Sequence, residues 1–291
     1  MSPLEQVWDA VNFFTKNPKY VKIDHEGIEV FSAIGIKMAN LPNNKKTVPR
    51  PAFTASDKMF IGYQLMASAV NYCYWYGNHD FRPNGANSTE MYKLLDSSFL
   101  GSILEGNEGV ALEMACYTFA EKLITARFPL AVKRSEHLKE LISPHLESTV
   151  ERLLLSKNLD DAIKLVLVYP GMSEDVFLKR MSLFFLFVHN HTDWFDEEIN
   201  RLPIPADYQV PKMLEHFGII TYSHELHGMI SEGKLIPSGS RMECEIRAST
   251  ILAAKLIAEK TGRSIGFIDQ YLWGRRKECD KPFHLTITTD Y

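Results

Sequence analysis

The stretch from Ile204 to Ile251 reads IPADYQVPKMLEHFGIITYSHELHGMISEGKLIPSGSRMECEIRASTI, and it decides the expected fold. Apolar residues in its first part recur at the spacing i, i+3, i+4 and i+7, as one face of a helix requires. They are Val210, Met213, Leu214 and Phe217. Pro211 has no N–H and must lie in the first turn, so this helix is predicted to begin near residues 208–210. Gly218 is a suitable residue to end it.

The rest of the chain is also predicted to be mainly helical. Helices are expected over residues 2–17, 57–76, 173–190, 223–232, 242–260 and 265–276, with three or four more between 90 and 168. Residues 20–36 are β-branched and partly alternating, so they are the best candidate for a small β element. Residues 38–54 and 77–90 are predicted loops. We therefore expect an all-α fold, with a small β element near residues 20–36.

The chain is expected to form one domain, residues 1–291. With 45% hydrophobic residues it can bury a large core, and no internal repeat or proline- or glycine-rich linker divides it. Its net charge of -4 provides no general basic surface for nucleic acid, which favours a small-molecule substrate. No apolar run is long enough to span a membrane, and the N-terminus lacks the pattern of a signal peptide. The sequence does not predict the oligomeric state.

The four cysteines indicate in which cellular compartment the protein is expected. None forms a CxxC pair, and three of them lie in apolar or helical contexts. Such cysteines are typical of reduced thiols in a core, and a cytoplasmic protein is expected. His189, His191, Asp193 and Glu197 suggest a metal cluster at first sight, but they lack any established metal-binding frame. We expect no metal and no organic cofactor.

Asp207 is the first candidate for chemistry. It precedes the predicted helix, where free N–H groups and the helix dipole favour an ionised carboxylate. One interpretation is a simple helix cap. The other is a functional carboxylate that stabilises or attacks a cationic reaction centre.

A series of short motifs resembles one family, the queuosine salvage proteins, which are queuosine-5′-phosphate N-glycosylases (hydrolases). The motifs occur in one order, densely over residues 165–291 and more thinly before. They are Asn71-Tyr72-Cys73-Tyr74-Trp75, Phe177-x-Lys179-Arg180, Ala206-Asp207-Tyr208-x-Val210-Pro211, Phe217-Gly218-x-x-x-Tyr222-Ser223, Ser238-Gly239, Glu243-x-Glu245-Ile246-Arg247, Asp269-x-Tyr271-Leu272-Trp273 and Pro282-Phe283-His284. Many weak motifs in one order are much more specific than any one of them.

The resemblance implies a helical fold similar to that of DNA glycosylases and a hydrolase that releases queuine from queuosine 5′-monophosphate for salvage. Asp207 would be the catalytic carboxylate, since cleavage of an N-glycosidic bond passes through an oxocarbenium-like state that a fixed carboxylate stabilises. The base is a 7-deazaguanine, so it lacks the nitrogen that ordinary purine hydrolases protonate. More of the barrier must then be lowered by stabilising the cation.

Two adjacent cations, Lys179 and Arg180, lie in an otherwise apolar stretch. Together they are candidates to hold the 5′-phosphate, with Lys179 matching the family's lysine. The alternative is a helix edge whose charged groups reach solvent.

The resemblance also implies a base pocket. Its candidate residues are Pro205, Tyr208, Asp269, Gln270, Tyr271, Trp273 and Trp75. Aromatic rings would stack on the base while the carboxylate accepts its N–H groups. On the predicted helix over 57–76, Trp75 would share a face with Asn71, either as a pocket wall or as core packing.

The chain departs from the family at Pro205, where members have a stacking phenylalanine, at Gln270, where an aromatic is expected, and at Gly274, where an acidic residue is expected. A glycosylase for another base therefore stays an alternative, as does a catalytically silent nucleotide-binding protein. A DNA-repair glycosylase is suggested only by the fold. Glu243 and Arg247, four residues apart, are interpreted as a structural ion pair, and His284 as a structural histidine.

Overall fold

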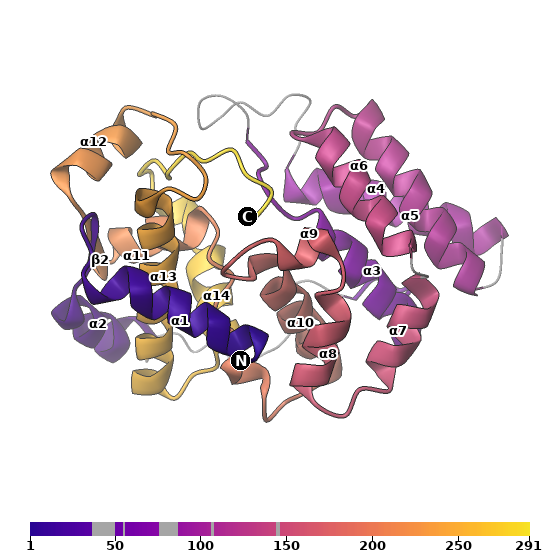
Figure 1. The fold of residues 1–291 in the computed structure, drawn as a ribbon, viewed down its shortest axis with the longest axis horizontal. Coiled ribbons are helices and arrows are strands. Elements are labelled where there is room, and N and C mark those ends of the chain that lie inside the picture. Colours follow the sequence, from indigo (N-terminus) through magenta and orange to yellow (C-terminus); the bar gives the residue numbers. More distant parts are fainter. Residues whose placement is uncertain (37–49, 55, 76–86, 106–107, 144–145) are drawn as a thin grey trace.

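The computed structural model describes residues 1–36, 50–54, 56–75, 87–105, 108–143 and 146–291. Helices dominate these residues, and their strands form one two-stranded sheet (Figure 1). The prediction of an all-α fold is confirmed. The loops predicted over 38–54 and 77–90 lie mostly outside the described residues. No helix in the described part is both long and apolar enough to cross a membrane.

The N-terminal elements are α1 (Pro3–Lys16), β1 (Val21–Ile23), α2 (His25–Val30) and the π-helical turn η1 (Phe31–Ile36). A capping box starts α1, because the Ser2 hydroxyl accepts the Glu5 N–H at 3.2 Å while the Glu5 carboxylate accepts the Ser2 N–H at 2.5 Å. The β element predicted near residues 20–36 is confirmed for β1 alone. Asp24 ends the strand by capping α2, where its carboxylate accepts the N–H of Gly27 at 3.0 Å.

The small sheet joins distant parts of the chain. β1 pairs antiparallel with β2 (Ile220–Tyr222), so that Val21 faces Tyr222 and Ile23 faces Ile220. Helix α13 (Arg241–Thr261) supports this pair, because the buried carboxylate of Glu245 accepts N–H groups of residues 19–21. The sheet therefore fixes the N-terminal region on the C-terminal part of the chain.

In the described part of the chain seven helices follow, and they gather on the right of Figure 1. They are α3 (Asp57–Ala69), α4 (Ser88–Glu105), α5 (Glu108–Thr125), α6 (Ala131–Ile142), α7 (Leu146–Leu154), α8 (Leu159–Val166) and α9 (Pro170–Ser173). The helix predicted over 57–76 ends earlier, at Ala69. The guanidinium of Arg134 in α6 donates to the main-chain oxygens of Val70, Tyr72 and Cys73, which keeps these residues out of the helix.

The remaining elements belong to the C-terminal part of the chain. They are α10 (Lys179–Thr192), the 3-10 turn η3 (Ile199–Arg201), α11 (Gln209–His216), β2, α12 (His224–Ser231), α13, α14 (Ile265–Gly274) and the 3-10 turn η4 (Arg276–Glu278). The helix predicted over 173–190 is confirmed from Lys179 onward, but its predicted start is wrong, since α9 ends at Ser173 and α10 begins at Lys179. Leu178 has a φ of 51°, a left-handed conformation that a continuous helix does not allow.

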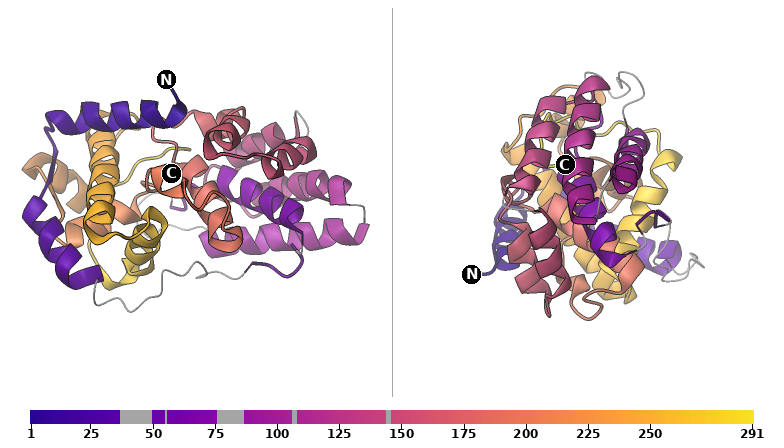
Figure 2. Two further views of the ribbon diagram at one scale, coloured as in Figure 1. Left: turned by 90° about the horizontal axis from the view of Figure 1, so that it is seen from below. Right: turned by 90° about the vertical axis from the view of Figure 1, so that its right-hand side faces the viewer.

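Two contacts between helices connect distant parts of the chain. α1 lies across α13 on one side, and α10 packs against α3 (Figures 1 and 2). One cluster of buried apolar side chains includes residues from Leu4 to Cys279, and all four of these helices contribute to it. That one domain spans residues 1–291 stays a prediction. The loop before α11, the start of α10 and the middle of α14 position the site described next.

Candidate active site

Asp207 lies in the turn between η3 and α11. Its Oδ1 accepts the N–H groups of Gln209 and Val210, at 2.7 and 3.0 Å, so it does cap the helix start. Its other oxygen, Oδ2, accepts no hydrogen bond from the described residues. Burial raises the pKa of Asp207, while the ammonium of Lys179 and the two N–H groups act in the opposite direction. The carboxylate is therefore fixed through one oxygen and leaves the other for a ligand.

Lys179 is the first residue of α10 and is almost fully buried. Its Nζ donates to the main-chain oxygen of Asn71 at 2.6 Å and to the Asn71 Oδ1 at 3.3 Å. Burial lowers the pKa of Lys179 to about 8, although the charges of Asp207 and Asp269 partly offset it. The ammonium group therefore lies within electrostatic reach of both carboxyl groups.

Asp269 in α14 is the third member of this group. Burial raises its pKa to about 8, the negative charge of Asp207 raises it further, and Lys179 lowers it. The structure thus brings together three predicted site residues, Lys179, Asp207 and Asp269, from three separate elements. We refer to them as the Lys–Asp–Asp cluster.

Arg180 points to different partners from its neighbour. Its Nη1 donates to the main-chain oxygen of Ala69 at 2.9 Å and to Nδ1 of His137 at 3.1 Å, and the side chain is 1% exposed. Burial lowers the pKa of His137 to about 4, so this imidazole is neutral and accepts the bond. The alternative of a helix edge reaching solvent is wrong for both cations, because both are buried. Phosphate binding by Arg180 stays a prediction.

Tyr208 and Trp75 join a small aromatic cluster beside Asp207. The ring of Phe283 lies 4.6 Å from that of Tyr208 and 6.4 Å from that of Trp75, centroid to centroid. Trp75 is only 2% exposed, as expected for core packing. The helical face that it was predicted to share with Asn71 does not exist, because α3 ends before both residues. Pro205, also buried, supplies the carbonyl that accepts the N–H of Asp207 at 2.8 Å.

The residues around Asp269 do not all face the same way. Tyr271 is buried against Phe31, with 5.8 Å between ring centroids. Trp273 is 38% exposed, and the guanidinium of Arg276 lies 3.4 Å from the centroid of its ring. The positive charge of Arg276 also lowers the pKa of Asp207, so this stacked pair belongs to the surroundings of the cluster.

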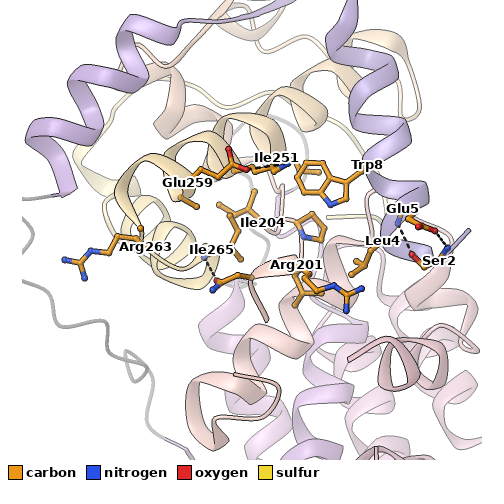
Figure 3. A pocket seen from close by; sticks show the side chains of 16 residues that line it. Ser2, Leu4, Glu5, Trp8, Arg201, Ile204, Ile251, Glu259, Arg263 and Ile265 are labelled. Carbon is orange, nitrogen blue, oxygen red and sulfur yellow. Dashed lines mark hydrogen bonds and ion pairs between the residues drawn. The ribbon is translucent and has the colours of Figure 1, made fainter. Parts of the chain in front are cut away.

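Gln270 lines a different space. It contributes to a cavity of about 290 Å³ between α10 and α14, together with His189 and Asp196. A larger cavity of about 600 Å³ lies between α1, α13 and the segment 200–204 (Figure 3). Its wall includes Trp8, and its floor includes Ile204, three residues before Asp207. Neither cavity is lined by the Lys–Asp–Asp cluster.

Sequence reasoning missed Asp175. Its two oxygens lie 2.8 and 2.7 Å from Nη1 and Nη2 of Arg247, and both side chains are about 1% exposed. The predicted pair of Glu243 and Arg247 is confirmed, at 3.5 Å, but Asp175 is the closer partner. The only sequence signal for this role was an acidic residue just before the Phe177-x-Lys179 motif.

His284, His189 and His191 have polar partners within the protein. His284 is buried and hydrogen-bonded through Nε2 to the Tyr291 hydroxyl at 3.0 Å, and burial lowers its pKa to about 3. The interpretation as a structural histidine is confirmed. His189 and His191 each lie within hydrogen-bonding distance of a main-chain oxygen. Within the described ranges, no group of three or more His, Cys, Asp or Glu residues could hold a metal ion.

The fold and the site together define a mainly helical protein that gathers a carboxylate before α11, an ammonium group at the start of α10 and a second carboxyl group in the middle of α14. Residues 181–290 match the family model described as queuosine salvage protein. The curated protein named "Queuosine 5'-phosphate N-glycosylase/hydrolase" of Sphaerobacter thermophilus is 26% identical, over 93% of each chain. Its namesake in Dictyostelium discoideum is 23% identical over 100% of each chain, and that of Mus musculus 21% over 98%. The chain is similar to the queuosine salvage proteins, and the resemblance seen in its motifs is confirmed.

Proposed function

We propose that this protein hydrolyses the N-glycosidic bond of queuosine 5′-phosphate and releases the base queuine. The single observation that carries the proposal is the Lys–Asp–Asp cluster. Two of its members lie within the part that matches the family model, Lys179 lies two residues before it, and full-length relatives bear the name of this reaction. The reaction adds water across the bond between the base and C1′ of the ribose, so the products are the free base and ribose 5-phosphate.

Asp207 would act at C1′. As the bond to the base breaks, positive charge develops on the sugar, and a carboxylate fixed beside it stabilises that charge. Oδ1 is held by two N–H groups at the start of α11, which leaves Oδ2 to face the cation or to form a bond with C1′. Water then completes the hydrolysis.

Asp269 would contact the base. Its pKa of about 8 means that the carboxyl group is mostly protonated at neutral pH, so that it can donate a hydrogen bond as well as accept one. Two carboxyl groups with different protonation states commonly divide the roles in a glycosidic site. Asp207 would take the ionised role, because Lys179 and the main-chain N–H groups oppose the rise in its pKa that burial causes.

Lys179 would hold the 5′-phosphate, as the family motif implies. Its ammonium group is positively charged below a pKa of about 8 and lies among the groups of the cluster. Arg180 would contribute less, because its hydrogen bonds lead to α3 and α6. Trp273, with Arg276 stacked on it, offers a partly exposed ring for the base.

A glycosylase for a different base is the second candidate. Pro205 supports it, since it stands beside Asp207 where the family has a stacking ring. Gln270 does not, because this residue lines the cavity between α10 and α14. Gly274 is exposed at the end of α14. The three departures therefore differ in their surroundings, since Pro205 adjoins Asp207, Gln270 lines another cavity and Gly274 is exposed.

We also propose that the protein acts on a free nucleotide in the cytoplasm as a single domain, without a nucleic-acid partner. The net charge of -4 and four buried, unpaired cysteines support this. The test is a substrate panel, in which queuosine 5′-phosphate, queuosine and guanosine 5′-phosphate are incubated with the protein and the released base is quantified by chromatography. Release of queuine, fastest from the phosphate, is expected. Release of base from guanosine 5′-phosphate alone would favour the second candidate, and binding without release would indicate a silent nucleotide-binding protein.

A further inference from the structure

We propose that Asp175 and Arg247 form a positioning pair that sets where Lys179 and Asp207 stand relative to each other. This inference rests on the function proposed above, because it assigns a further role in that reaction. Neither residue belongs to the Lys–Asp–Asp cluster. The proposal depends on hydrogen bonds from this one buried pair to the start of α10, which carries Lys179, and to the peptide group before Asp207.

The first set of bonds fixes the start of α10. Asp175 Oδ1 accepts the N–H of Phe177 at 2.9 Å, and its Oδ2 accepts the N–H of Lys179 at 2.8 Å. The residue before the helix, Leu178, has a left-handed conformation and provides no side-chain cap. Asp175 therefore satisfies the N–H groups that a conventional cap would otherwise serve. In doing so it fixes the point from which the Lys179 side chain extends.

The second set fixes the peptide group that leads into Asp207. Nε of Arg247 donates to the carbonyl oxygen of Ala206 at 3.2 Å. The other end of the same peptide group, the N–H of Asp207, donates to the Pro205 oxygen at 2.8 Å. Since both polar ends of this group are held, its plane cannot turn freely, and the direction of the Asp207 side chain is set.

One guanidinium joins the two sets. While Nε of Arg247 holds the Asp207 side, its Nη1 and Nη2 bind the two oxygens of Asp175. The group is also enclosed by aromatic rings, with the centroids of Phe177 and Tyr291 at 4.8 and 4.5 Å. A planar, bidentate contact of this kind fixes direction as well as distance.

Stability alone does not account for such a pair. A buried ion pair is often no more stabilising than well-packed apolar residues of similar volume, because both charges lose their hydration. A positioning role explains why the charges are buried here, since a small displacement of a reacting group strongly lowers the rate of the catalysed reaction.

The test compares wild type with the double variant Asp175→Leu/Arg247→Met, which replaces both charges by apolar groups of similar length. Melting temperature, kcat and KM for queuine release from queuosine 5′-phosphate are measured. The proposal predicts little change in KM and a fall in kcat of about 100-fold, as expected for a group misplaced by about 1 Å. The melting temperature should fall as well, because the Glu243 carboxylate and the N–H groups of Phe177 and Lys179 lose a buried partner. A folded double variant with the kcat of wild type would overturn it.

A matched control comes from the same helix. Glu245 is also buried and also accepts main-chain N–H groups, but those of residues 19–21 beside the small sheet. Glu245→Gln should lower the melting temperature and leave kcat per folded molecule unchanged. An equal fall in kcat in this control would mean that loss of stability alone lowers the rate, which would contradict the positioning role.

If the double variant does not fold, the variant Arg247→Lys is measured in its place, because lysine keeps the charge but cannot contact Asp175 and Ala206 together. A wild-type kcat in that variant would overturn the proposal. If wild type releases no queuine, the proposed function fails, and the crystal structure of the variant tests the positioning separately. The Ala206 carbonyl must then have moved or turned, and an unmoved carbonyl would contradict the inference.

Discussion

The carboxyl groups of Asp207 and Asp269 interact across the site although they come from different elements. Burial and the negative charge of Asp207 together raise the pKa of Asp269 to about 8. Lys179 acts on both groups in the opposite direction, and its own pKa is lowered to about 8 by burial. At neutral pH one carboxyl group can therefore serve as the charged group while the other keeps its proton.

The raised pKa of Asp269 predicts a change of stability with pH. The folded protein binds a proton at Asp269 up to about pH 8, whereas the unfolded chain releases it near its ordinary pKa of 3.8. The contribution of this group therefore declines as the pH rises from about 4 to about 8. Asp269→Asn removes the dependence, so its melting temperature relative to wild type should increase from pH 5 to pH 8. A difference that is the same at both values would show that Asp269 is not protonated in the folded state.

Lys179→Gln should reduce the preference for a phosphorylated substrate. If the ammonium group binds the 5′-phosphate, kcat/KM for queuosine 5′-phosphate should fall about 10- to 100-fold relative to that for queuosine, the scale of a hydrogen bond to a charged group. Both substrates are to be measured with the same enzyme preparation. An equal fall for both would instead assign Lys179 to supporting Asp207, since that effect does not depend on the phosphate.

The two tryptophans should respond differently to replacement by alanine. Trp273 is partly exposed, so Trp273→Ala should raise KM about 5- to 100-fold if the base stacks on it, with little change in melting temperature. Trp75→Ala removes a buried ring and should lower the free energy of unfolding by about 3–5 kcal/mol. Steady-state kinetics and thermal unfolding separate the two effects. Equal losses of stability would argue against a binding role for Trp273.

A pH–rate profile should show a decline on the alkaline side. Both Lys179 and Asp269 lose a proton near pH 8, and the proposed roles require the protonated form of each. We expect kcat/KM to fall as the pH rises through about 8. In Asp269→Asn the decline should persist because Lys179 still titrates. A profile that stays flat to pH 10 would remove both groups from the protonated roles.

Elements set by local pattern were predictable from the sequence. The start of α11 at Gln209 follows from Pro211 and the apolar spacing, and its end follows from Gly218, whose φ is 71°. Elements set by distant residues were not. α3 ends where Arg134, more than sixty residues away, binds the main-chain oxygens, and β1 depends on a partner strand about two hundred residues later.

The same distinction applies to the site. The short motifs indicated Lys179, Asp207 and Asp269, and the structure brings these three together. Asp175 had no pattern of its own, because its role depends on Arg247 of a different helix. Gln270 adjoins Asp269 in sequence but lines another cavity, since adjacent residues of a helix point about 100° apart. Contacts of this kind depend on the assembled core.

Single-turnover release of queuine from queuosine 5′-phosphate, by wild type and by Asp207→Asn, tests the central claim most directly. The asparagine keeps an oxygen that can accept the N–H groups of Gln209 and Val210, so the fold and the start of α11 should be preserved. The proposed mechanism predicts release by wild type and a rate about 100- to 1,000-fold lower in the variant, the scale of one essential electrostatic group. Release at the same rate by the folded variant would contradict the role of Asp207.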